Sequence, residues 1–120
     1  MNRWVLLEHK IIDGNLIDIH YDFLVEDQLD CFTWKLNEIP YLNKGSVEIG
    51  KQPNHRLVWL SRVKYQLSNN RGIVKRIDHG TFSYFFHNQD SKVLKIKLNG
   101  NLLKGLLIID GNCCQLMKNN

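Results

Sequence analysis

The chain has 120 residues, 16 Lys and Arg against 12 Asp and Glu, and a formal net charge of +4. This length suits one domain with a real core and is too short for two domains of ordinary size, so we expect a single domain over residues 1–120. The modest positive charge suits a polyanionic partner, although the basic residues are scattered and form no basic tail.

The sequence contains neither a charged-then-apolar leader nor an apolar run near the roughly 18 residues of a membrane span. We therefore expect a cytoplasmic protein with no membrane association. The three cysteines, Cys31, Cys113 and Cys114, form no C-x-x-C pair. An odd number of cysteines without that spacing indicates reduced packing residues rather than a disulfide framework or a thiolate zinc site.

The first predicted element is a β-hairpin. An apolar run is followed by the turn signal Asp13-Gly14-Asn15, and the next run alternates, with apolar side chains at the odd positions 17–25. Alternate residues of a strand point to the same face, so His20 and Asp22 share the face opposite that apolar row. The antiparallel return of the chain brings His9 beside His20.

Two imidazoles and one carboxylate form a plausible ligand set for a divalent cation. His9, His20 and Asp22 suit Mn²⁺, Fe²⁺ or Zn²⁺, and ligand type alone does not choose among these metals. The alternative is a half-exposed strand on which the same side chains simply face solvent.

The middle of the chain reads as a long irregular connection and then a basic segment. Residues 37–54, which contain both prolines, are expected to be irregular, and a short helical turn is expected within 57–62. Residues 54–82 concentrate cationic and aromatic side chains that can grip phosphate and stack on bases. The alternative is a solvated basic strand beside core aromatics. The side chains concerned are His55, Arg56, Trp59, Arg62, Tyr65, Arg71, Lys75 and Arg76.

The second half of the chain alternates strand-like runs with turn signals. Runs rich in branched and aromatic residues at 72–77, 81–86, 93–98 and 103–109 are separated by turn signals that include Asp78-His79-Gly80. This rhythm predicts an all-β, mainly antiparallel protein of about eight strands with at most one short helix. Closure removes exposed edges, so a small β-barrel is favoured over an open sheet, and a two-sheet sandwich is the alternative.

A collinear set of short motifs covers residues 4–118. The set consists of His9, His20-Tyr21-Asp22-Phe23, Thr33-Trp34, His55-Arg56-Leu57, Ser68 with Arg71-Gly72, Val74, Asp78-x-Gly80-Thr81, Leu98-x-Gly100 and Leu103-Lys104-Gly105. In this order the motifs resemble the 3′-phosphoesterase domain of bacterial DNA ligase D, and especially its short stand-alone relatives.

The resemblance implies a β-barrel phosphoesterase that uses Mn²⁺ or a similar divalent ion to trim 3′ ends in non-homologous end joining. Such enzymes remove a 3′-terminal ribonucleoside and then the remaining 3′-phosphate. By motif, the resemblance implies His9, His20 and Asp22 as metal ligands and His55 as the histidine that engages the scissile phosphate.

Arg71 and Arg76 are expected to act with His55 by offsetting charge that develops on the phosphoryl oxygens. The chain departs from the ligase-fused members of the family at Leu24, Pro53 and Trp59, where those members have Arg, an acidic residue and Tyr. The alternative is therefore a catalytically weakened module that binds nucleic-acid ends. Expected partners are 3′ ends of DNA or RNA, with a ligase or polymerase in trans, and the expected oligomeric state is a monomer.

Overall fold

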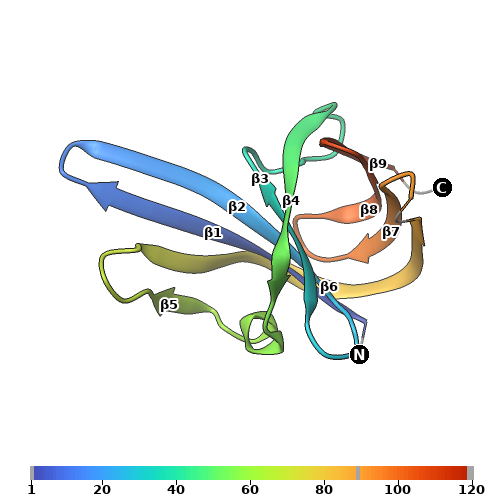
Figure 1. Ribbon diagram of the computed structural model, residues 1–120. Coiled ribbons are helices and arrows are strands. Elements are labelled where there is room, and N and C mark those ends of the chain that lie inside the picture. The colour runs from blue at the N-terminus through green and yellow to red at the C-terminus, as the bar shows by residue number, and fades with distance from the viewer. Residues whose placement is uncertain (1, 89, 119–120) are drawn as a thin grey trace.

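The computed structural model describes residues 2–88 and 90–118, and these residues form the all-β fold that the turn rhythm predicts (Figure 1). Within these ranges the only helical segment is the 3-10 turn η1 (Leu57–Leu60), inside the stretch where the sequence predicts a helical turn. The strands are β1 (Arg3–Asp13), β2 (Leu16–Glu26), β3 (Cys31–Leu36), β4 (Val47–His55), β5 (Lys64–Gln66), β6 (Ile73–Asn88), β7 (Val93–Asn99), β8 (Lys104–Asp110) and β9 (Cys113–Met117).

Eight of the described strands close into an antiparallel ring. The order is β1-β2-β3-β4-β9-β8-β7-β6, and β6 pairs with β1 to complete the circle. The short strand β5 pairs with the first residues of β6, outside the ring. Closure in this order pairs the two edges that an open sheet would expose to other chains.

The strand β6 is continuous through the stretch 78–80, so the predicted turn there is wrong. Its first half pairs with β1 and its second half with β7. Gly80 is required for a close approach instead: a Cβ atom there would lie 2.0 Å from the carbonyl oxygen of Asn99. Asp78 is buried and accepts hydrogen bonds from three backbone N–H groups of the turn after β7, those of Asn101, Leu102 and Leu103.

Two apolar clusters lie on opposite faces of the ring wall. The inner cluster fills the ring and consists of Trp4, Leu6, Phe23, Val25, Trp34, Leu36, Val47, Ile49, Leu94, Ile96, Leu98, Leu103, Leu107, Ile109, Cys114 and Leu116. The outer cluster consists of Val5, Leu7, Leu24, Cys31, Leu60 and Val74. Because alternate residues of β1 enter different clusters, this strand is buried on both faces where η1 covers it.

The β1–β2 hairpin extends beyond the rest of the ring (Figure 1). β3 pairs with β2 only from Tyr21 onward, so the end of the hairpin near the turn has no neighbour on that side among the described residues. Phe23 and Val25 are buried as predicted, whereas Ile17 and Ile19 are 61% and 41% exposed. The predicted apolar row along β2 is therefore a core row over only part of its length.

The predicted irregular connection is shorter than expected. β4 occupies residues 47–55, so Pro53 lies near the end of a strand and only residues 37–46 lack strand structure. None of the described segments is a helix of the length and apolarity that crossing a membrane would require.

Candidate functional site

The three predicted metal ligands lie together on the outer face of the ring. The hairpin register pairs His9 with His20 and Leu7 with Asp22. Residues directly opposite each other in a sheet share a face, and Leu7 belongs to the outer cluster. His9, His20 and Asp22 therefore extend the row of outer-cluster residues toward the tip of the hairpin.

Donor atoms of the three side chains converge. Nδ1 of His9 lies 3.2 Å from Nε2 of His20, and the same Nε2 atom lies 3.6 Å from Oδ1 of Asp22. One possible ligand atom from each residue lies within 4.8 Å of the other two. The side chains of His20 and Asp22 are only 14% and 13% exposed. A set of donors this compact and this shielded from water can hold one divalent cation.

The backbone of the 68–72 loop sets the tautomer of His9. The Nε2 atom of His9 donates a hydrogen bond of 2.6 Å to the carbonyl oxygen of Arg71. Since the proton is on Nε2, Nδ1 of a neutral His9 carries a lone pair that faces His20 and Asp22. Metal-binding histidines usually make such a bond through the nitrogen that does not bind the ion.

The hydrogen bonding of the His20 imidazole is incomplete among the described residues. Its Nδ1 atom is buried and has no hydrogen-bond partner among the described residues. Burial lowers the pKa of His20 below its ordinary value, against the attraction of the Asp22 carboxylate. The neutral imidazole is the form that a cation needs. Binding a cation through Nε2 would move the ring proton to Nδ1, where it would lack an acceptor.

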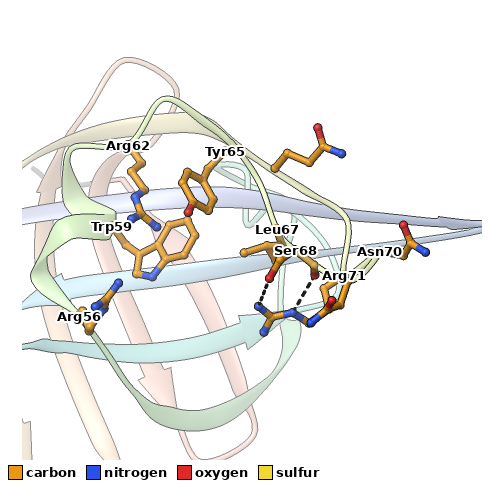
Figure 2. A pocket seen from close by; sticks show the side chains of 10 residues that line it. Arg56, Trp59, Arg62, Tyr65, Leu67, Ser68, Asn70 and Arg71 are labelled. Atoms are coloured by element: carbon orange, nitrogen blue, oxygen red, sulfur yellow. Dashed lines mark hydrogen bonds between the residues drawn. The ribbon is translucent and has the colours of Figure 1, made fainter.

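An arginine-rich cleft of about 600 Å³ begins at the loop that carries Arg71 (Figure 2). The cleft lies between η1, β5 and the 66–71 segment, and no acidic residue is among its described lining residues. Its lining consists of Arg56, Trp59, Arg62, Tyr65, Gln66, Leu67, Ser68, Asn69, Asn70 and Arg71. Because the Arg71 carbonyl holds His9, this cationic cleft adjoins the candidate metal site.

Two arginines in the cleft are held in defined orientations (Figure 2). The guanidinium carbon of Arg62 lies 4.3 Å from the ring centroid of Trp59 and 3.9 Å from that of Tyr65. The guanidinium of Arg71 donates to the carbonyl oxygen of Ser68 at 3.1 Å and to its hydroxyl at 3.3 Å. Both cations are therefore oriented before any ligand arrives, which lowers the entropic cost of binding an anion.

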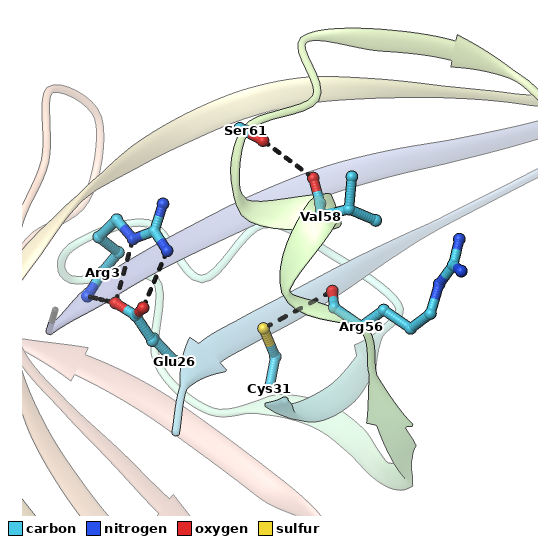
Figure 3. Close-up of polar contacts among 6 residues, drawn as sticks. All are labelled: Arg3, Glu26, Cys31, Arg56, Val58 and Ser61. Carbon is cyan, nitrogen blue, oxygen red and sulfur yellow. Dashed lines mark hydrogen bonds and ion pairs between the residues drawn. The ribbon is translucent and has the colours of Figure 1, made fainter. Parts of the chain in front are cut away.

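Arg56 approaches the cleft from the end of β4. The buried Cys31 thiol donates to the carbonyl oxygen of Arg56 at 3.9 Å, and the hydroxyl of Ser61 donates to the carbonyl oxygen of Val58 (Figure 3). The Cys31 contact holds the start of η1 against β3, the Ser61 contact closes the η1 turn, and the Arg56 side chain extends away from both. Burial raises the pKa of Cys31 to about 11, so this thiol is a packing residue, as predicted.

The structure brings only part of the predicted catalytic set together. Arg71 lines the cleft, whereas neither His55 nor Arg76 is among its described lining residues. His55 pairs with Cys31 at the start of β3, and the Nδ1 atom of His55 lies 3.1 Å from the carbonyl oxygen of Pro53. Arg56 and Arg62 were visible in the sequence only as members of a basic segment, and no spacing rule marked them as partners of Arg71.

Leu24 is a core residue of the outer cluster. It lies two residues beyond Asp22 on the same strand face, and its side chain is fully buried. Trp59 packs against the same cluster. An arginine in place of Leu24 would therefore enter an apolar core.

No family model matches the sequence, and a search of curated proteins likewise finds no match.

Proposed function

We propose that this protein is a divalent-metal-dependent phosphoesterase that acts on the 3′ ends of DNA or RNA. The observation that carries the proposal is the joining of His9, His20 and Asp22 to an arginine-lined cleft through the Arg71 carbonyl. A cation site beside a cationic cleft suits a substrate whose scissile group is a phosphate diester or monoester. The motif resemblance to the 3′-phosphoesterase family supports the same substrate class.

Each part of the site has a distinct task in this proposal. His9, His20 and Asp22 would hold a divalent ion, which would supply polarisation of a phosphoryl oxygen and a lowered pKa of a water molecule. Arg71 and Arg56 bind phosphate oxygens, and their positive charge offsets the charge that develops during the reaction. Asp22 and the neutral His20 supply ligand atoms, and the Arg71 carbonyl keeps Nδ1 of His9 free for the same purpose. His55 and Arg76 contribute only if the substrate extends beyond the cleft.

A labelled primer-template that ends in a 3′-ribonucleotide or a 3′-phosphate tests the proposal. We expect shortening or phosphate release with Mn²⁺, loss of activity with chelator, and loss of activity in a folded His20→Ala variant. Activity that survives both chelation and His20→Ala would contradict the proposal.

The arginines are tested by the salt dependence of end binding. Each phosphate neutralised on a single strand contributes a slope of about −0.7 in a plot of log affinity against log salt. We expect Arg71→Gln to flatten the slope by about this amount and the matched variant Arg76→Gln to change it less. An equal effect of both variants would show that the nucleic acid also contacts residues outside the cleft.

The second candidate function is a module that binds nucleic-acid ends without cleaving them. The apolar packing of Leu24 favours this alternative, because a buried leucine of the outer cluster stands where the ligase-fused members of the resembled family have an arginine. Metal-independent binding of 3′ ends, with no product after long incubation, would favour this alternative over the enzyme.

A further inference from the structure

The ring has a second cavity, at the opening of its interior. The cavity has a volume of about 500 Å³ and is lined by Phe32, Trp34, Lys51, Asn54, His87, Lys92, Leu94, Ile109, Gly111 and Asn112. It shares no lining residue with the arginine cleft. Trp34, Leu94 and Ile109 also belong to the inner cluster, so core residues form the floor of the cavity.

The two ends of the ring are built differently. At one end the turn after β7 folds inward, Leu103 is fully buried in the inner cluster, and the Gly100 backbone packs against Trp4. At the other end His87 and Lys51 follow the inner-facing rows of β6 and β4, and the cavity lies above Trp34, Leu94 and Ile109. The mouths of small β-barrels are common ligand sites, and this volume lies within the usual range for small molecules.

Aromatic rings form one wall of the cavity. The rings of Phe32 and His87 meet edge to face with centroids 5.2 Å apart, and Phe32 also lies 6.4 Å from Trp34. The ammonium of Lys51 lies 5.1 Å from the ring centroid of Trp34 and 5.9 Å from that of Phe32. A wall of ring faces and edges suits a planar, apolar ligand body.

The charges at the rim are positive. The Lys51 ammonium is held by the carbonyl oxygens of Thr33 and Gln52 and by the side-chain oxygen of Asn54, at 3.3, 2.7 and 3.2 Å. Lys92 and the ring nitrogens of His87 form no side-chain hydrogen bond or ion pair with the described residues. None of the described residues that line the cavity is acidic, although Asp27 and Asp30, outside the lining, attract His87 and Lys51 respectively. Lys51 therefore supplies a fixed positive charge, and Lys92 and His87 supply free donors.

We propose that this cavity binds a small organic anion with a planar ring system. The ring body lies on Trp34, Leu94 and Ile109 against Phe32, and the acidic group lies at the rim between Lys92 and His87. Burial lowers the pKa of both His87 and Lys51, so an anion at the rim would stabilise their charged forms. The proposal does not depend on the phosphoesterase activity.

The probe for the test is 8-anilinonaphthalene-1-sulfonate, with uncharged N-phenyl-1-naphthylamine as the comparison ligand. We expect saturable binding of one sulfonate probe per native chain, measured by fluorescence and calorimetry in the presence of chelator. The double variant His87→Gln/Lys92→Gln should weaken sulfonate binding at least about tenfold, because it removes hydrogen bonds to a charged group, and should change binding of the uncharged probe little.

Three variants control the assignment. His79→Gln/Lys64→Gln removes the same two residue types from exposed positions outside the cavity and should leave binding unchanged. Arg56→Gln/Arg71→Gln should also leave it unchanged, and a loss there would assign the probe to the arginine cleft. Asn112→Trp places a large ring at the exposed rim and should block both probes in a chain that still melts cooperatively.

Loss of sulfonate binding in Arg56→Gln/Arg71→Gln overturns the proposal, and so does any of three further results. These are equal weakening by the two His/Lys double variants, full binding by a folded Asn112→Trp chain, and binding of several probes per chain without saturation. If the His87/Lys92 variant does not fold, the Asn112→Trp chain decides the question on its own.

Discussion

The imidazole of His9 donates from Nε2 to the backbone carbonyl oxygen of Arg71 over 2.6 Å. This bond joins a strand near the N-terminus to a loop more than sixty residues later in the sequence. It frees Nδ1 of His9 for a cation and places the loop of the arginine cleft beside that cation. The candidate metal site and the candidate phosphate site are therefore adjoining parts of one surface.

Replacing Asp22 by Asn should remove most of the affinity for Mn²⁺ without unfolding the ring. The amide keeps the size of the side chain but loses the negative charge that a divalent cation requires. We expect isothermal calorimetry to show at least about tenfold weaker binding, the range typical for loss of a group that supports a metal site. Asp110→Asn, an exposed change at the end of β8, is the matched control. Equal affinity of the Asp22→Asn chain and the wild type would exclude Asp22 as a ligand.

Gly72→Ala should disturb both the fold and the metal site. Gly72 has a φ of +98°, and a Cβ atom there would lie 2.3 Å from the carbonyl oxygen of Lys10. Since Gly72 follows Arg71, relief of this clash moves the loop away from His9. We expect a loss of about 2–4 kcal/mol in the free energy of unfolding, from left-handed strain and overpacking together, and weaker metal binding.

Gly14→Ala is the matched control for Gly72→Ala. Gly14 also has a positive φ, +62°, but an added Cβ atom would have no neighbour within 4 Å. This change should cost only about 1 kcal/mol in urea unfolding and leave metal affinity unchanged. Similar losses for the two variants would show that backbone strain alone, and not the contact with Lys10, limits position 72.

Leu24→Arg should destabilise the protein rather than improve a phosphate site. The Leu24 side chain is fully buried between Val5, Leu7 and Leu60 in the outer cluster. A guanidinium there would be an unpaired charge in an apolar environment, and we expect a loss of at least about 3 kcal/mol in the free energy of unfolding. Leu29→Arg, at a position that is 89% exposed, should change stability by less than about 0.5 kcal/mol. Normal stability with faster phosphate release in Leu24→Arg would contradict this packing.

The contact between Glu26 and Arg3 should make stability depend on acid pH (Figure 3). Hydrogen bonds from the Arg3 side chain, the shortest 2.8 Å, lower the pKa of Glu26 from its ordinary 4.5 to about 2. The folded state therefore binds fewer protons than the unfolded state between these values. The stabilisation is complete above about pH 4.5 and is lost as the pH falls toward 2.

Glu26→Gln should remove this dependence. Because the Arg3 side chain is 46% exposed, we expect the change to lower stability at pH 7 by only about 1–2 kcal/mol. Urea unfolding between pH 2 and pH 7 measures the effect. Glu38→Gln, which breaks an exposed pair with Lys44, is the control and should alter the free energy of unfolding by less than about 1 kcal/mol. Identical pH profiles for the wild type and Glu26→Gln would show that the Arg3 contact does not stabilise the fold.

The all-β class and the pairing of His9 with His20 could both be predicted from the sequence. Both depend on local rules: a tight turn at 13–15 sets the register of one hairpin, and the two-residue period of a strand places His20 and Asp22 on one face. Local patterns also marked the short helical turn at η1. These features need no information about distant parts of the chain.

The neighbours of these residues depend on the tertiary structure. Leu24 and His20 share a strand face, yet η1 covers Leu24 and His20 belongs to the candidate cation site, because segments distant in sequence cover only part of that face. Gly80 was read as a turn residue but permits the close approach of Asn99, since glycine serves both purposes and only packing distinguishes them. The cavity at the ring opening has the same origin: it joins side chains from β3, β4, β6, β7 and β8, and ring closure sets which of these segments meet. The arginine cleft instead lies within the single segment 56–71, where the path of the chain through η1 and β5 brings the arginines together.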